Sequence, residues 1–146
     1  IAPLGTKPRT LGGAITLAAA EVADFVDAKY VCVFTESGDT ARRMSRLRFR
    51  IPMKAFTPEV AMQRRMQLTW GIESYLVDRV THTDAMYQQV DDILLAEGLA
   101  EVGDKVVVIS GSPPGVPGGT NDLRVHTIGD AANAAAPVWE AGELPG

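Results

Sequence analysis

The stretch YVCVFTESGDTARRM, residues 30–44, decides the fold. Its first five residues form a short, continuously apolar run, which is typical of a strand buried on both faces of a parallel sheet. Ser37 and Gly38 predict a turn, and Asp39 begins a helix with Ala41, Met44 and Leu47 directed inward. A buried strand that runs into a helix is the unit from which α/β folds are built.

Helices are predicted on both sides of this strand. Thr10 can cap an upstream helix whose apolar positions recur at spacings of three and four: Leu11, Ile15, Ala18, Val22 and Phe25. The downstream helix is expected to end at Pro52, and its outer side carries five arginines: Arg42, Arg43, Arg46, Arg48 and Arg50. Three of these, Arg42, Arg46 and Arg50, are four positions apart and are expected on one stripe. We interpret the arginines as a solvated face or a contact with another domain or subunit. A nucleic-acid-binding surface is not favoured, because the chain is acidic overall and no aromatic residues are interleaved with the arginines.

The rest of the chain continues the alternation of strands and helices. Met53 to Phe56 predicts a strand, and Thr57 with Pro58 predicts a helix start that leads to about Leu68. A weaker strand at Ser74–Val77 precedes a long helix that Thr83 can cap and Gly98 can stop. Two more strands are expected, a central one at Lys105–Ile109 and an edge strand at Arg124–Ile128.

These elements predict a three-layer α/β/α sandwich. Its sheet has about five mostly parallel strands, with the last strand antiparallel at an edge. We expect residues 1–10 to be a linker, residues 11–129 to form the folded domain, and residues 130–146 to be a flexible tail.

The overall composition excludes several classes of partner. With 14 Lys plus Arg against 18 Asp plus Glu, the net charge is -4, which offers no general attraction to nucleic acid or to an anionic membrane. No apolar run approaches the roughly 20 residues that span a bilayer. The single cysteine, Cys32, lies in an apolar run, as expected of a buried thiol in a reduced compartment. We therefore expect a cytoplasmic protein.

Neither the two histidines nor Trp70 predicts a metal or ligand site. His82 and His126 lack a cysteine or paired carboxylate at ligand spacing, so no metal site is expected. Trp70 is expected to pack between a helix end and the sheet.

Two loops follow strands and can carry function. The loop Thr35–Ala41 places hydroxyls, a glycine and free backbone N–H groups at a helix N-terminus, which is suited to holding phosphate. A capped strand-to-helix turn explains the same residues equally well. The loop Ser110–Asn121 is longer than a simple connection needs, although a plain excursion between two strands also accounts for it.

Taken in order, the loop motifs of this chain resemble the C-terminal domain of pyruvate kinases. They are Thr-x-Ser-Gly-x-Thr-Ala-Arg at Thr35–Arg42, Gly103-Asp104 before a valine run, Ser110-Gly111 with Pro114-Gly115, Gly119-Thr120-Asn121, and Val125-His126. The resemblance covers about residues 11–128. It implies a five-stranded α/β domain that follows a catalytic barrel, holds an effector site and takes part in a homo-tetramer.

The resemblance also implies which residues act. The first loop would bind effector phosphate and the second would close over the ligand, which together assign Thr35, Ser37, Gly38, Asp39, Thr40, Arg42, Gly115, Gly118, Gly119 and Thr120. Phosphoryl transfer from phosphoenolpyruvate to ADP, giving ATP, belongs to the barrel. No catalytic residue, metal ligand or cofactor is therefore assigned to this chain, and magnesium and potassium are implied for the parent enzyme.

The charges of the first loop indicate which class of effector it can bind. Glu36 and Asp39 would repel a bisphosphate, and Met86 is neutral in the long helix. We therefore expect a sugar monophosphate or AMP to be favoured over fructose 1,6-bisphosphate. A stand-alone phospho-ligand-binding module without a kinase partner is the alternative reading of the whole chain.

Overall fold

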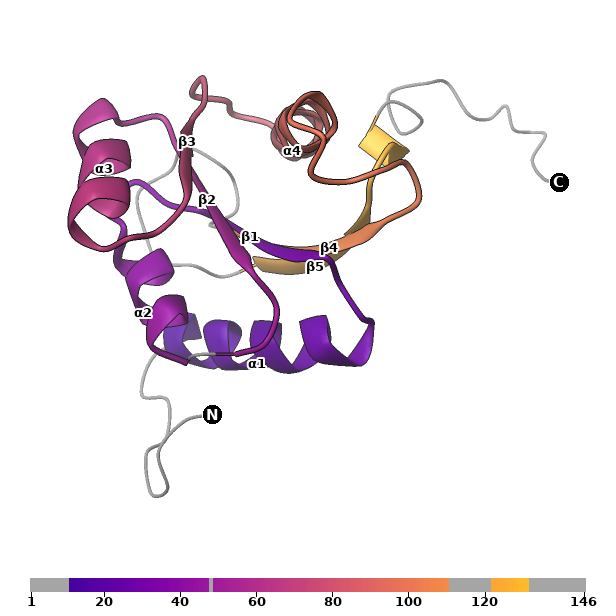
Figure 1. The fold of residues 1–146 in the computed structure, drawn as a ribbon, viewed down its shortest axis with the longest axis horizontal. Helices are drawn as coiled ribbons and strands as arrows, with labels where there is room; N and C mark the ends of the chain where they lie inside the picture. The colour runs from indigo at the N-terminus through magenta and orange to yellow at the C-terminus, as the bar shows by residue number, and fades with distance from the viewer. Residues whose placement is uncertain (1–10, 48, 111–121, 132–146) are drawn as a thin grey trace, which may run out of the picture.

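The computed structural model describes residues 11–47, 49–110 and 122–131, and Figure 1 shows their arrangement. Five strands form one sheet in the order β3-β2-β1-β4-β5: β1 (Tyr30–Phe34), β2 (Met53–Thr57), β3 (Ser74–Leu76), β4 (Lys105–Ser110) and β5 (Asp122–Thr127). The first four strands are parallel, whereas β5 pairs antiparallel with β4, Val107 lying opposite Val125. This confirms the predicted sheet and its antiparallel edge strand. The central strand is β1, and β4 is its neighbour.

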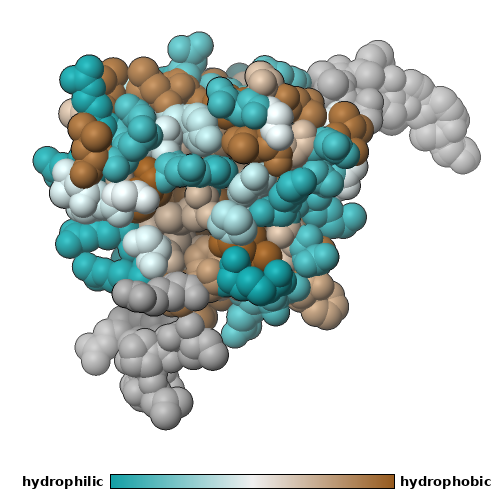
Figure 2. All heavy atoms as spheres, in the orientation of Figure 1, coloured by the Kyte–Doolittle hydropathy of each residue, from teal (hydrophilic) through white to brown (hydrophobic). Residues whose placement is uncertain are grey.

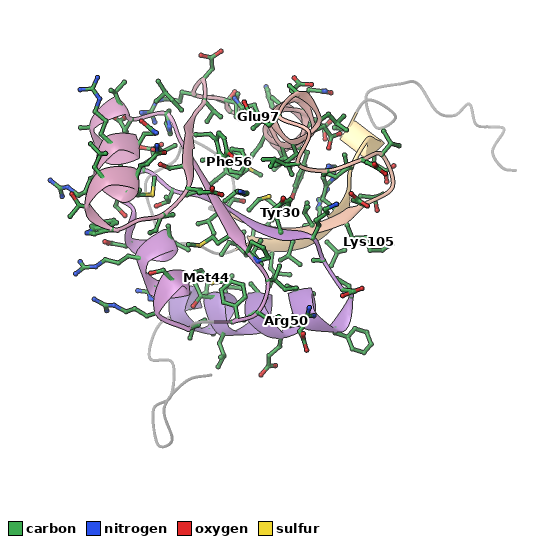
Figure 3. All side chains as sticks on the ribbon, viewed as in Figure 1. Tyr30, Met44, Arg50, Phe56, Glu97 and Lys105 are labelled. Atoms are coloured by element: carbon green, nitrogen blue, oxygen red, sulfur yellow. The ribbon has the colours of Figure 1, made fainter. Side chains whose placement is uncertain are left out.

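Helices cover both faces of the sheet. The helices α1 (Leu11–Phe25), α2 (Asp39–Leu47) and α3 (Val60–Arg64), with the π-helical turn Arg65–Thr69, pack on one face, while α4 (Thr83–Ala96) covers the other. Alternate residues of β1 point to opposite faces: Val31 and Val33 belong to the first core cluster, and Cys32 belongs to the second. Met44 and Phe56 mark these two clusters on opposite sides of the sheet in Figure 3.

The face of α1 that packs on the sheet agrees only in part with the predicted one, because Ile15 and Val22 pack against the first core cluster but the fully buried residues are others. Thr16, Ala19 and Ala23 are buried, whereas Leu11 and Phe25 are 62% and 90% exposed. The helix is apolar around most of its circumference, so hydrophobic periodicity does not select one stripe. The small side chains let the helix lie close to the sheet, and that close approach decides which face is inside.

The helix α2 ends at Leu47, before the predicted end at Pro52. Arg50 therefore lies beyond the helix and does not share a stripe with Arg42 and Arg46. Its guanidinium contacts Asp24 of α1 at 2.7 Å, beside α1 in Figure 3.

The third helix begins later than Thr57 and Pro58 predict. Thr57 is the last residue of β2, because its carbonyl accepts a hydrogen bond from the Val77 N–H at 2.9 Å and extends the pairing with β3. The helix α3 begins at Val60 with Glu59 as its N-cap. Similarly, His82 occupies the N-cap of α4, and Thr83 is the first helical residue.

The surface of the domain has no single character. On the face shown in Figure 2, apolar and polar side chains are interspersed.

The single cysteine is part of the core. Burial raises the pKa of the Cys32 thiol well above its ordinary range, as expected for a core cysteine. Among the described residues, no helix has both the length and the hydropathy needed to cross a bilayer. The predicted linker, and the predicted tail beyond Ala131, lie outside the described residues.

Candidate functional site

The candidate site lies where the chain changes direction across the sheet. From β1 the chain proceeds through β2 to β3 on one side, and then returns to place β4 on the other side of β1. Such a switch point leaves a crevice at the carboxyl ends of the two strands, where ligands of α/β proteins bind. The loop after β1, beginning at Thr35, lies at this position.

Hydroxyl groups organise the loop from within. The Thr35 Oγ1 accepts a hydrogen bond from the Gly38 N–H at 2.9 Å, and the Ser37 Oγ accepts one from the Asp39 N–H at 3.2 Å. Each hydroxyl keeps its own hydrogen as a donor. The loop therefore presents O–H donors beside the N-terminus of α2, where backbone N–H groups and the helix dipole favour an anion.

Gly38 is the point at which the rest of the fold holds the loop. Its φ is +81°, and a Cβ at this position would lie 2.6 Å from the Met62 sulfur and 2.8 Å from the Trp70 ring. The Arg42 guanidinium lies over the same ring, 5.1 Å from its centroid. Trp70 thus packs between the end of the π-helical turn and the first core cluster, as the sequence predicts, and it also braces the loop.

A charged cluster joins this loop to two others. The Arg79 guanidinium, after β3, contacts Glu36 of the β1 loop through Nη1 and Glu59, after β2, through Nη2. We call Glu36, Arg79 and Glu59 the loop cluster. All three side chains are about half exposed. Sequence reasoning missed Arg79, although its position just after the third parallel strand places it at the same sheet edge as the β1 loop.

The structure describes all six of the site residues predicted in and just after the first loop. Thr35, Ser37 and Gly38 form the loop, and Asp39, Thr40 and Arg42 lie in the first turns of α2. The four residues predicted in the second loop, Gly115, Gly118, Gly119 and Thr120, lie outside the described residues.

The structure corrects two assumptions that the sequence suggested about charge at the site. Met86 is 1% exposed and belongs to the second core cluster, so its neutrality says nothing about the loop. Glu36 is paired with Arg79, so its charge is partly compensated. The sequence did not reveal either fact, because both depend on which way a side chain points.

A second polar cluster lies between α4 and β5. The buried carboxylate of Asp91 bonds the His126 Nε2 through Oδ1 at 2.8 Å, and its Oδ2 accepts hydrogen bonds from the N–H groups of Gly129 and Ala131. The Tyr87 ring stacks on His126 with centroids 5.0 Å apart, and Arg124 lies over Tyr87. We call Tyr87, Asp91 and His126 the buried cluster, and Arg124 is an exposed residue at its rim.

A cavity of about 460 Å³ opens beside the buried cluster. It is lined by Asp84, Tyr87, Arg124, Val125, His126, Thr127, Asp130 and Ala131. Within residues 11–47, 49–110 and 122–131, no three His, Cys, Asp or Glu side chains are placed to hold a metal ion. The histidine and aspartate here tie α4 to the end of the sheet.

Comparisons with known proteins agree on one family. The family model for the α/β domain of pyruvate kinase matches residues 13–126. The pyruvate kinase of Corynebacterium glutamicum is 43% identical over 128 residues, which are 88% of this chain and 27% of that protein. The pyruvate kinase of Mycobacterium tuberculosis is 42% identical over the same shares.

A solved structure supports the same assignment. A pyruvate kinase from Cryptosporidium parvum superposes with a TM-score of 0.74 at 25% identity, covering 84% of this chain and 24% of that one. The chain thus spans about a quarter of the length of the relatives it matches. The family-model match covers all the helices and strands except the first two residues of α1 and the last residue of β5. This chain belongs to the pyruvate kinase α/β domain family.

Proposed function

We propose that this chain is the regulatory domain of a pyruvate kinase and that the loop after β1 binds the phosphate group of a small effector. The observation that carries this proposal is the braced loop Thr35–Asp39. Its two hydroxyls accept hydrogen bonds from the Gly38 and Asp39 N–H groups and keep their own hydrogens as donors beside the N-terminus of α2, and the Trp70 ring lies against Gly38, whose left-handed conformation most residues do not adopt. A preformed donor set loses little conformational entropy on binding an anion.

The parent enzyme follows from the family. It would transfer phosphate from phosphoenolpyruvate to ADP in glycolysis, with magnesium and potassium at a catalytic barrel that this chain does not include. The domain would then act on the barrel and take part in a homo-tetramer. By itself the chain would bind an effector without catalysing phosphoryl transfer.

The charge balance of the site favours an effector with one phosphate group. The loop and first turn of α2 carry Glu36 and Asp39, and Arg79 already contacts two carboxylates. A second phosphate would add negative charge beside these two carboxylates. A sugar monophosphate or AMP is therefore the proposed effector class, ahead of fructose 1,6-bisphosphate.

Calorimetric titration with AMP, glucose 6-phosphate, ribose 5-phosphate and fructose 1,6-bisphosphate tests the site and the effector class. We expect a monophosphate to bind, and Ser37→Ala to weaken it about tenfold, since a hydrogen bond to a charged group is worth roughly 1.5–3 kcal/mol. Ser45→Ala is the matched control, because its hydroxyl bonds only within α2, to the Arg42 carbonyl.

The outcomes separate the two parts of the proposal. If none of the four ligands binds, the phosphate site is wrong. If fructose 1,6-bisphosphate binds most tightly, the site stands and the effector class is wrong. Fluorescence offers a second readout, because Trp70 contacts the loop and Trp139→Phe would leave it as the single tryptophan.

A further inference from the structure

Arg79 is the residue through which three loops of the sheet edge meet. Its two terminal nitrogens are divided between Glu36, in the loop after β1, and Glu59, at the start of α3. The strands β1 and β3 are not neighbours, since β2 lies between them. Arg79 therefore reaches across β2 to the loop that carries the predicted phosphate ligands.

The contacts of Arg79 are of a kind that a ligand can exchange. The side chains of Arg79, Glu36 and Glu59 are 47%, 46% and 49% exposed, so water and salt screen their attraction. Exposed ion pairs are weak, typically below about 1 kcal/mol. A phosphate group that the loop donors also hold makes a stronger, charge-assisted hydrogen bond with a guanidinium nitrogen.

The other described cations of this region are placed differently. Arg42 rests over the Trp70 ring, and Arg43 and Arg46 are exposed along α2. Arg79 differs from them because its partner, Glu36, is itself a residue of the loop. Glu36 lies between Thr35 and Ser37 in the chain, so a phosphate bound by this loop would compete with the Glu36 carboxylate for Arg79.

We propose that Arg79 determines ligand specificity at this site: the ligand phosphate displaces Glu36 from Nη1, while Glu59 keeps hold of Nη2 and positions the guanidinium. This inference rests on the proposed function and deepens it. Glu36 then competes with the ligand phosphate for Arg79, which lowers the affinity of the site for its ligand. One terminal nitrogen of the guanidinium becomes available, which matches one phosphate group.

Calorimetric titration of the wild-type chain and four variants with the same four ligands tests this role. Arg79→Gln is expected to weaken the binding monophosphate about tenfold or more, the scale of a lost charge-assisted hydrogen bond. Arg46→Gln is its matched control, with the same loss of charge on the last turn of α2, and should change affinity less than about twofold.

The two glutamates provide the sharper comparison. Glu36→Gln should strengthen binding roughly two- to fivefold, because it frees Arg79 and removes a repelling charge. Glu59→Gln removes the same charge from the same arginine but only loosens its positioning, so affinity should stay equal or fall. If both variants strengthen binding equally, the effect is one of total charge and the proposed exchange is wrong.

Failure of this inference is distinguishable from failure of the proposed function. Binding by the wild-type chain with unchanged affinity in Arg79→Gln and Glu36→Gln would overturn the role of Arg79 alone. Absence of binding in both the wild-type chain and Glu36→Gln would overturn the phosphate site and this inference with it. Circular dichroism of each variant checks that the fold is retained.

Discussion

The loop cluster and the buried cluster are built from similar groups but differ in their access to water. Each contains a carboxylate bonded to a nitrogen of another side chain, and each joins elements that are distant in sequence. Glu36, Arg79 and Glu59 are about half exposed, whereas the side chains of Asp91 and His126 are 3% and 6% exposed. In the buried cluster, both oxygens of Asp91 are used by protein donors.

The difference in exposure separates a structural role from a binding role. A buried carboxylate whose two oxygens both accept hydrogen bonds cannot exchange partners without leaving those donors unsatisfied, which is costly in a medium of low polarity. Half-exposed partners can be replaced by water or a ligand at little cost. We therefore expect the buried cluster to govern stability and the loop cluster to govern binding.

The largest expected effect is that of Asp91→Ala. It would leave His126 and the N–H groups of Gly129 and Ala131 without their acceptor, and should lower the free energy of unfolding by about 3–5 kcal/mol. Asp92→Ala is the control one position along α4, where the side chain is exposed and bonds only Gln88. Urea denaturation should find that the control costs less than about 0.5 kcal/mol. Equal costs would show that burial does not distinguish the two positions.

Gly38→Ala should come next, because it disturbs the brace of the loop. Its Cβ would collide with Met62 and Trp70, adding about 1–3 kcal/mol of overpacking to a left-handed strain of about 1–2 kcal/mol. Gly71→Ala isolates the strain, since Gly71 has φ +68° but no atom within 4 Å of the added Cβ. Denaturation of both variants measures the difference, and an equal loss would mean that Trp70 does not brace the loop.

Tyr87→Phe should have a smaller effect and the opposite sign. The Tyr87 hydroxyl is buried and has no hydrogen-bond partner within the described part of the chain, so its removal should be neutral or stabilising by about 1 kcal/mol. A clear loss of stability in urea denaturation would show that this hydroxyl is bonded in solution.

The same variant has a pH signature. Burial raises the pKa of Tyr87 above its ordinary 10.0, so the folded state keeps a proton that the unfolded state releases. Stability should therefore fall as pH rises through about 10, and Tyr87→Phe should remove part of this fall. Urea unfolding of the wild-type chain and of Tyr87→Phe at pH 8 and above pH 10 measures this fall in stability. An equal fall in the two proteins would contradict the prediction.

The smallest expected effect on stability is that of Arg79→Gln. Its two ion pairs are half exposed, so their loss should change the free energy of unfolding by less than about 1 kcal/mol, and less still at high salt. Denaturation at low and high salt checks this. A cost near that of Asp91→Ala would make the loop cluster structural and would remove the distinction between the two clusters.

The sequence predicted the order and type of the elements but placed several details incorrectly. Runs such as Lys105–Ile109 are apolar on consecutive positions and identify buried strands directly. The predicted inward face of α1 was right at Ile15 and Val22 but wrong at Leu11 and Phe25, because that helix is apolar nearly all round and its small residues decided the packing. The end of α2 and the start of α3 were wrong because ends depend on neighbouring elements, such as the Val77 bond that draws Thr57 into β2.

For the candidate site, the chain by itself determined the β1 loop, because a hydroxyl-rich turn between a buried strand and a helix is a local pattern. Only the tertiary structure decided that Trp70 braces Gly38, that Arg79 reaches Glu36 across β2, and that Met86 is buried in the core. These are contacts between residues distant in the chain. Their existence depends on how strands are ordered and helices are turned, and these are set by the packing of the whole domain rather than by any single stretch of sequence.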